Sequence, residues 1–196
     1  EAFVIGEEFI KKDNVALVLG DNFFYGQSLG SKLKESTKLT RGAKVFLHKV
    51  SKPELYGVAK INKKNKIIKI VEKPKKFISD YAITGLYFFD NNVVKYAKSL
   101  KPSKRGETEI IDLLEIYKKQ KKLNADFIGR GGAWLDTGSI RDFYNTSNFV
   151  NTIENRQGFK IACLEEIALT NNWIKKKEII NSIKFYGNCD YSNYLK

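Results

Sequence analysis

The sequence predicts an α/β fold in which helices cover a mixed central sheet and a helical part follows at about residues 139–196. Strand-like apolar runs alternate with amphipathic helical patterns over the first two thirds of the chain, and helical patterns take over after them. The chain has 196 residues, of which 42% are hydrophobic and 13% aromatic. This content can fill a core and excludes wholesale disorder. We therefore expect one domain, residues 1–196, without repeats.

The first half of the chain predicts a strand–helix–strand unit followed by a hairpin. The continuous apolar run at 15–19 is typical of a strand buried on both faces, as in a parallel sheet. Residues 28–39 predict a helix and residues 43–50 the next strand. The pattern then indicates strands at 57–61 and 66–71, joined by the turn-forming residues 62–65.

The second half predicts two more strands and a series of helices. Residues 81–89 indicate a strand, 92–99 a short helix that ends before Pro102, and 124–129 another strand. Residues 109–122 predict an amphipathic helix with acidic residues at its start and lysines at its end, which suits the helix dipole. Residues 139–156 and 164–195 are expected to be helical, with breaks at Gly158 and Gly187.

The net charge of +13 has two interpretations. A basic surface attracts nucleic acid, anionic lipid or phosphorylated substrates. Here most of the basic residues are lysines spread over turns and helix ends, whereas nucleic-acid sites favour arginine forks and aromatic platforms. We expect no nucleic-acid partner, and a basic binding module remains the less favoured alternative. No apolar run approaches the roughly 20 residues that span a bilayer, and with two cysteines and no secretory leader pattern the expected location is the cytoplasm.

Two aspartates follow apolar segments at positions where an α/β sheet gathers ligands. Asp21 ends the segment Leu19-Gly20-Asp21, and Asp136 ends Ala133-Trp134-Leu135-Asp136. If they meet, they can hold a Mg²⁺ ion, which prefers one or two carboxylates together with substrate phosphates. The alternative is that both are helix caps or turn residues.

Three further segments carry groups that suit a phosphorylated ligand. Lys73 can meet a phosphate as a point charge, and Arg105 precedes a predicted helix start, where anions are favoured. Tyr56-Gly57 offers backbone without a side chain at a strand entrance. Each has a plainer alternative: a solvated lysine, a surface arginine and a turn glycine.

Taken in order, these motifs resemble the glucose-1-phosphate thymidylyltransferases, short-form sugar-nucleotide transferases. The resemblance extends over essentially the whole chain. It rests on LGDNFFYG at 19–26, YGV at 56–58, VEKP at 71–74, YAITGLYFFD at 81–90, RGETEI at 105–110, GRGGAWLDTG at 129–138 and NRQGFK at 155–160. It implies a Rossmann-like nucleotidyltransferase fold. It also implies the reaction of dTTP with glucose 1-phosphate to give dTDP-glucose and pyrophosphate, toward dTDP-rhamnose, in a homotetramer.

The resemblance also implies roles for individual residues. Asp21 and Asp136 would be the Mg²⁺ ligands, and Lys73, Arg105 and Asp136 would be the catalytic residues, the first two holding the sugar phosphate. The sugar-nucleotide site would be formed by Asp21, Asn22, Tyr56, Gly57, Glu72, Lys73, Ile83 and Trp134. A regulatory nucleotide site would include Tyr25, Gly26, Gly129 and Arg130.

The sequence departs from this family at its front. The family opens with a strand and a glycine-rich G-G-x-G-T-R-L loop, and the 196 residues contain no such motif. We therefore expect an N-terminally truncated form of the fold, which is inactive alone and has an exposed apolar edge beside residues 15–19. The alternative is a non-catalytic nucleotidyltransferase-like partner or remnant.

Overall fold

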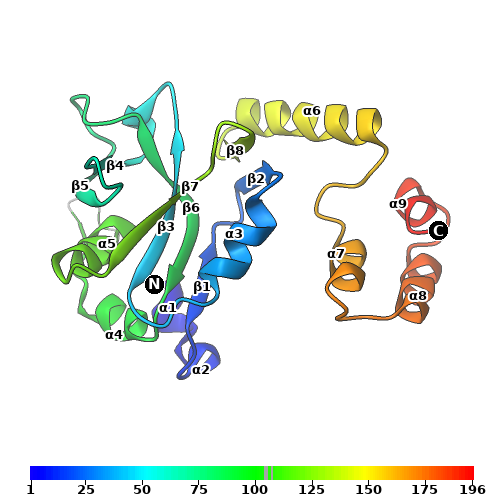
Figure 1. Cartoon of the computed structure of the whole chain (residues 1–196), viewed down its shortest axis with the longest axis horizontal. Coiled ribbons are helices and arrows are strands. Elements are labelled where there is room, and N and C mark those ends of the chain that lie inside the picture. The colour runs from blue at the N-terminus through cyan, green and yellow to red at the C-terminus, as the bar shows by residue number, and fades with distance from the viewer. Residues whose placement is uncertain (104–105, 107) are drawn as a thin grey trace. The chain divides into compact units, whose positions relative to one another are not determined.

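A six-stranded mixed sheet organises the first of two compact units, Glu1–Thr137. The computed structural model describes residues 1–103, 106 and 108–196. The spatial order is β5-β4-β6-β3-β7, with β1 also paired to β6 (Figure 1). Among the paired strands of the described residues, β3 and β7 form the one parallel pair, and the other pairs of this sheet are antiparallel. The mixed sheet with helices confirms the predicted fold class. The strands are β1 (Val15–Val18), β3 (Ala43–Lys49), β4 (Gly57–Ile61), β5 (Ile67–Glu72), β6 (Tyr81–Phe89) and β7 (Leu123–Phe127).

The central strand β6 has two differently occupied edges. Strand β3 pairs along the whole of one edge, from Ala43 opposite Phe89 to Lys49 opposite Tyr81. Strands β4 and β1 therefore share the other edge. Because β1 and β3 both run antiparallel to β6, they are parallel to each other, connected through helix α3 (Leu29–Ser36). This confirms the predicted strand–helix–strand unit, with β6 between its strands.

The expectation of a strand buried on both faces at 15–19 is wrong. Strand β1 pairs antiparallel with β6, and its residues alternate between half-buried and exposed. Ala16 and Val18 are exposed, Val18 by 57%. An uninterrupted apolar run cannot distinguish a strand covered on both faces from one that leaves an apolar face open. The open edge expected beside residues 15–19 stays a prediction.

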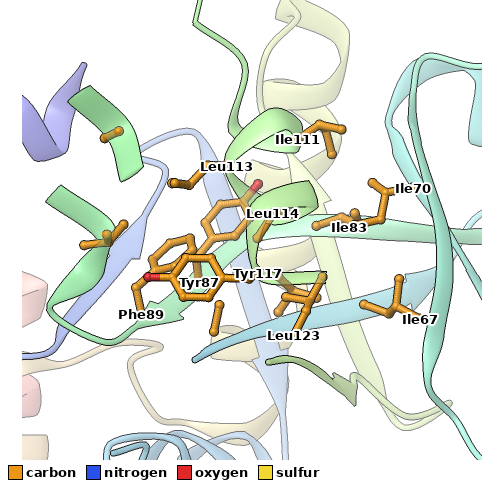
Figure 2. Packing of buried hydrophobic residues seen from close by; sticks show 14 of the residues in the cluster. Ile67, Ile70, Ile83, Tyr87, Phe89, Ile111, Leu113, Leu114, Tyr117 and Leu123 are labelled. Carbon is orange, nitrogen blue, oxygen red and sulfur yellow. The ribbon is translucent and has the colours of Figure 1, made fainter. Parts of the chain in front are cut away.

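Helices α4 (Asn92–Ser99) and α5 (Ile110–Lys119) supply much of the core. Leu113, Leu114 and Tyr117 of α5 pack over Tyr87 and Phe89 of β6 (Figure 2). Burial of each such side chain contributes about 1.5–3 kcal/mol to folding. The phenol of Tyr117 donates a 2.8 Å hydrogen bond to the buried carboxylate of Asp90. These contacts fix α5 against β6. Two short helices, α1 (Ala2–Ile5) and α2 (Glu7–Ile10), precede β1, and η1 (Pro53–Leu55) precedes β4.

A two-stranded antiparallel ribbon lies apart from the main sheet. It joins β2 (Asn22–Gly26) to β8 (Gly132–Asp136), with Asn22 opposite Asp136 at one end and Gly26 opposite Gly132 at the other. The sequence did not predict these strands as a pair. The paired residues of the two strands lie more than 100 positions apart in the sequence, so no local turn pattern predicts the pairing.

The second unit, Gly138–Lys196, is helical, as the sequence predicts for 139–196. It contains α6 (Ile140–Gln157), α7 (Leu164–Thr170), α8 (Lys176–Tyr186) and α9 (Asp190–Tyr194). Gly158 ends α6 with a φ of 72° and Gly187 ends α8 with a φ of 68°, which confirms both predicted breaks. A further break at 171–175 was not predicted. Among the described residues, no helix combines the length and hydropathy required to cross a bilayer.

Candidate active site

A gap along one edge of β6 forms the candidate site. On this edge, β4 pairs at Ala82 and β1 pairs from Leu86 onward, so the ladder is interrupted between them. A cavity of about 270 Å³ opens at the gap, and Ile83, Gly85 and Tyr87 line it because alternate residues of a strand share one face. The lining includes all nine described residues that the resemblance implies for the metal, sugar-nucleotide and catalytic roles: Asp21, Asn22, Tyr56, Gly57, Glu72, Lys73, Ile83, Trp134 and Asp136.

The ribbon brings the two aspartates to this cavity from distant parts of the chain. Asp136 is the last residue of β8, and Asp21 lies in the turn that leads into β2. The backbone oxygen of Asp21 accepts hydrogen bonds from the N–H and the hydroxyl of Thr137, at 2.8 and 2.9 Å. The helix-cap alternative for Asp136 is wrong, since Ser139 caps α6 by accepting from the N–H of Asp142 at 3.1 Å.

The donor set of the cavity suits a divalent cation that also binds substrate. Asp21 and Asp136 offer carboxylate oxygens, the donors that Mg²⁺ prefers. Within 1–103, 106 and 108–196, no group of three or more His, Cys, Asp or Glu side chains is arranged to hold a metal ion. One or two carboxylates completed by phosphate oxygens is the pattern expected for Mg²⁺, so these residues fit the ion. Their role as ligands remains a prediction.

The hairpin of β4 and β5 forms another part of the cavity wall. Gly57 pairs with Glu72, and a Cβ atom at Gly57 would lie 2.8 Å from Ile111 Cδ1 and 2.9 Å from Glu72 Oε2. A side chain at position 57 would have to displace the ends of these two side chains, and Gly57 begins β4, so the turn-glycine alternative is incomplete. Lys73 follows β5 with a φ of 41°, and its N–H donates to the carbonyl of Tyr56 at 3.0 Å. This sparsely populated backbone conformation fixes the position from which the Lys73 side chain extends.

Aromatic rings close one side of the cavity. Trp134 is 9% exposed, and its ring centroid lies 5.0 Å from that of Tyr56 and 6.5 Å from that of His48. His48 is held by a 3.1 Å contact between Nδ1 and the carbonyl of Ile128. The Trp134 indole is therefore fixed from two sides, with its Nε1–H directed to Asn22 Oδ1 at 2.6 Å.

Several lining residues were missed by the sequence analysis. They are Leu19, Leu55, Gly85, Tyr87, Ile110 and Ile111. Burial raises the pKa of the Tyr87 phenol, and the nearby carboxylates of Glu72 and Asp21 raise it further. The phenol thus stays protonated and can donate a hydrogen bond. A glycine inside the strand 81–89 was an available signal, because interior strand glycines mark a close approach.

Arg105 lies outside the described residues, so the structure does not place it. Its implied role at the sugar phosphate stays a prediction.

A second, larger cavity of about 460 Å³ lies at the other end of the ribbon. Tyr25, Gly26 and Gly129, three of the four residues implied for a regulatory site, line it. Arg130, the fourth, is exposed and is not among the lining residues. Lys32 is the only charged residue in the lining, among the residues that the structure describes, and it pairs with Asp126 at 2.6 Å.

Comparison with known proteins places these observations in a family. A family model described as nucleotidyl transferase matches residues 1–153. The chain is 47% identical over 195 residues to a glucose-1-phosphate thymidylyltransferase of Neisseria meningitidis serogroup A, and 41% identical to one of Mycobacterium tuberculosis. These matches cover 100% of this chain and 68% and 67% of the relatives.

Solved structures give the same result for the fold. A Bacillus anthracis structure described as a glucose-1-phosphate thymidylyltransferase in complex with a sucrose aligns with a TM-score of 0.67 and 39% identity, over 76% of this chain. A UDP-glucose pyrophosphorylase complexed with UDP-glucose aligns with a TM-score of 0.66 and 26% identity, over 77% of this chain. This chain spans 58% and 61% of those two chains. The protein belongs to the nucleotidyl transferase family, among the glucose-1-phosphate thymidylyltransferases.

Proposed function

We propose that the cavity at the β6 gap is the sugar-nucleotide site of a thymidylyl transfer reaction. In this reaction dTTP and glucose 1-phosphate give dTDP-glucose and pyrophosphate. The observation that carries the proposal is the convergence of two carboxylates, Lys73, Glu72 and the bare backbone of Gly57 on one cavity. The names of the relatives supply the substrates. This product would serve the pathway toward dTDP-rhamnose.

The chemistry requires two anions to be brought together in line. An oxygen of the sugar phosphate attacks the α-phosphorus of the nucleotide, and pyrophosphate leaves on the opposite side. No general base is needed, because a phosphate monoester is already ionised. The chain's task is therefore positioning and charge neutralisation. Lys73 and Arg105 would hold the sugar phosphate, and a Mg²⁺ ion bound by Asp21 and Asp136 would offset the repulsion between phosphates.

The remaining lining groups suit a sugar. Glu72 can accept hydrogen bonds from hydroxyl groups, and backbone at Gly57 and Ile83 can approach them closely. Tyr56 and Trp134 offer an aromatic wall against which an apolar sugar face can pack. Asn22 completes the set that we assign to this site.

We assign the larger cavity, with Tyr25, Gly26 and Gly129 in its lining and Arg130 beside Gly129 in the chain, to a regulatory nucleotide. A homo-oligomer, a tetramer by analogy with the family, and a cytoplasmic location belong to the same proposal. The free thiols of Cys163 and Cys189 agree with a reducing compartment.

A non-catalytic role is the second candidate. It applies to the 196 residues taken alone, which hold no G-G-x-G-T-R-L motif and cover 68% of the Neisseria meningitidis relative. Such a loop presents backbone N–H groups to a triphosphate, and a small misplacement of a reacting group can cost on the order of 10²-fold in rate.

The deciding experiment measures pyrophosphate release from dTTP and glucose 1-phosphate. It compares the 196-residue chain with the same chain preceded by the glycine-rich segment of a relative. We expect turnover only in the longer chain. Comparable turnover by both would show that the triphosphate is held without that loop. If neither turns over while a relative does, the non-catalytic role is favoured.

A further inference from the structure

The side-chain amide of Asn22 connects three elements at the edge of the cavity. Its Nδ2 donates to Asp21 Oδ1 at 2.8 Å. Its Oδ1 accepts from the backbone N–H of Gly85 on β6 at 3.0 Å and from the indole Nε1–H of Trp134 on β8 at 2.6 Å. One side chain thus links β2, the gap in β6 and the middle of β8.

The orientation of this amide follows from the chemistry of its partners. The Gly85 N–H and the Trp134 indole N–H can only donate, so both must face an acceptor. The acceptor is Oδ1, which turns Nδ2 toward Asp21, whose carboxylate can only accept when ionised. Flipping the amide would set donors against donors at Gly85 and Trp134. The structure therefore admits one orientation, and in it the amide holds the Asp21 carboxylate.

Close packing leaves the amide little freedom to move. A Cβ atom at Gly85 would lie 2.6 Å from both Cγ and Oδ1 of Asn22, so the amide lies directly over the glycine. The backbone oxygen of Gly85 accepts from Leu19 at 2.9 Å, where β1 ends. Asn22 therefore takes the place of the missing strand partner at the Gly85 N–H. The hydrogen bond that Gly85 lacks within the ladder is therefore the same one that holds the Asn22 amide in place.

We propose that Asn22 is a positioning residue that orients the Asp21 carboxylate toward a bound divalent cation. It commits one carboxylate oxygen; the other has no hydrogen-bond partner within the part of the chain that the structure describes and is available to a ligand. The inference rests on the proposed function, in which Asp21 and Asp136 hold the cation. It adds that the cation site depends on Trp134 and Gly85 through Asn22.

The test measures Mn²⁺ binding to the 196-residue chain by electron paramagnetic resonance, with thermal unfolding followed in parallel. We expect Asn22→Ala to weaken Mn²⁺ binding about 10- to 100-fold, the usual effect of removing a group that orients a metal ligand. Asn91→Ala is the matched control. Its amide also makes two hydrogen bonds, to the carbonyls of Lys11 and Asp13 at 2.7 and 3.2 Å, but it lies outside the cavity. It should lower Tm without changing Mn²⁺ affinity.

Two further variants keep the test decisive. Trp134→Phe removes one donor to Oδ1 and keeps an aromatic ring, so it should give an intermediate loss of affinity if Asn22→Ala fails to fold. Asp21→Asn tests the cation site separately from the positioning role of Asn22. If Asp21→Asn weakens binding while Asn22→Ala and Trp134→Phe bind as the unsubstituted chain does, the positioning role is wrong and the cation site stands. If the unsubstituted chain binds no Mn²⁺, or Asp21→Asn binds equally well, the cation site itself is wrong and the inference falls with it.

Discussion

The two cavities at the ends of the β2–β8 ribbon differ in the chemistry of their linings. The smaller cavity, at the Asn22–Asp136 end, gathers Asp21, Asp136, Glu72 and Lys73. The larger one, at the Gly26–Gly132 end, is lined mainly by glycines and small or apolar residues. Charged groups gather where a strand ladder is interrupted, whereas glycines leave space where two backbones approach. Volume alone would select the end of the ribbon opposite to the one that we propose for the chemistry.

The sharpest way to break this comparison is to remove a carboxylate from the smaller cavity. In an active chain extended by the glycine-rich segment, Asp136→Asn should lower kcat/KM on the order of 10²- to 10⁴-fold. This loss corresponds to several kcal/mol of transition-state stabilisation. Steady-state kinetics measure this loss, and a thermal melt should show little change. Asp13→Asn, an exposed aspartate outside both cavities, is the control. Equal loss of folding and activity would make Asp136 structural.

A smaller effect is expected at the lysine. Lys73→Ala should raise KM for glucose 1-phosphate about 10- to 100-fold, because a hydrogen bond to a charged group is worth about 1.5–3 kcal/mol. KM for dTTP should change less. Lys75→Ala, at an exposed lysine two residues further along the chain, should leave both values unchanged. Unchanged kinetics for Lys73→Ala would make it an ordinary surface charge.

A substitution in the larger cavity should change ligand affinity rather than the rate of turnover. Tyr25→Ala should weaken binding of dTTP or dTDP-glucose at a second site on the order of tenfold, if the ring stacks on a base. Isothermal titration calorimetry with two-site fitting measures the effect, and Phe77→Ala, an exposed aromatic residue elsewhere, is the control. A single binding site in the unsubstituted protein would contradict the assignment.

The ion pair beside the larger cavity predicts a modest pH effect. Burial alone would raise the pKa of Asp126, but hydrogen bonds from Lys32 and from the Phe127 N–H outweigh it and hold that pKa below its ordinary value. A lowered carboxyl pKa stabilises the fold above the unfolded-state pKa, and this contribution is lost as the pH falls through the folded-state value. Lys32→Ala should therefore lower Tm more at pH 7 than in acid.

The expected size is small, about 0–1 kcal/mol, as for other partly exposed pairs. Lys34→Ala, which removes an exposed lysine of the same helix, is the control for this measurement. A Tm difference that does not vary with pH would exclude the pair as its source.

The smallest expected effect concerns the charge of +13. Because lysines are spread over turns and helix ends, neither cavity is expected to form part of a nucleic-acid groove. We expect no submicromolar binding to arbitrary duplex DNA at physiological salt, measured by fluorescence anisotropy. Tight binding with a steep salt dependence would favour the basic-module alternative.

The local elements were predictable because their signals are local. The hairpin at 57–72, the helix at 92–99 and the glycine stops at Gly158 and Gly187 depend on periodicity and turn chemistry within a few residues. The apolar run at 15–19 was misjudged, because the apolar pattern alone does not state which faces are covered. The ribbon was missed since its two strands are distant in sequence.

The sequence by itself determined the family, most strands and helices of the main sheet and its cover, and the motif residues that line the cavity, because motifs and periodicity are written in adjacent residues. The tertiary structure decided how those groups meet. The interruption of the ladder on β6 opens the cavity, and the pairing of Asn22 with Asp136 brings Asp21 and Asp136 to one place. The bare backbone of Gly85 admits the Asn22 amide. Such contacts depend on chain segments 60 or more residues apart, whose approach is set by packing of the whole unit and not by any local preference.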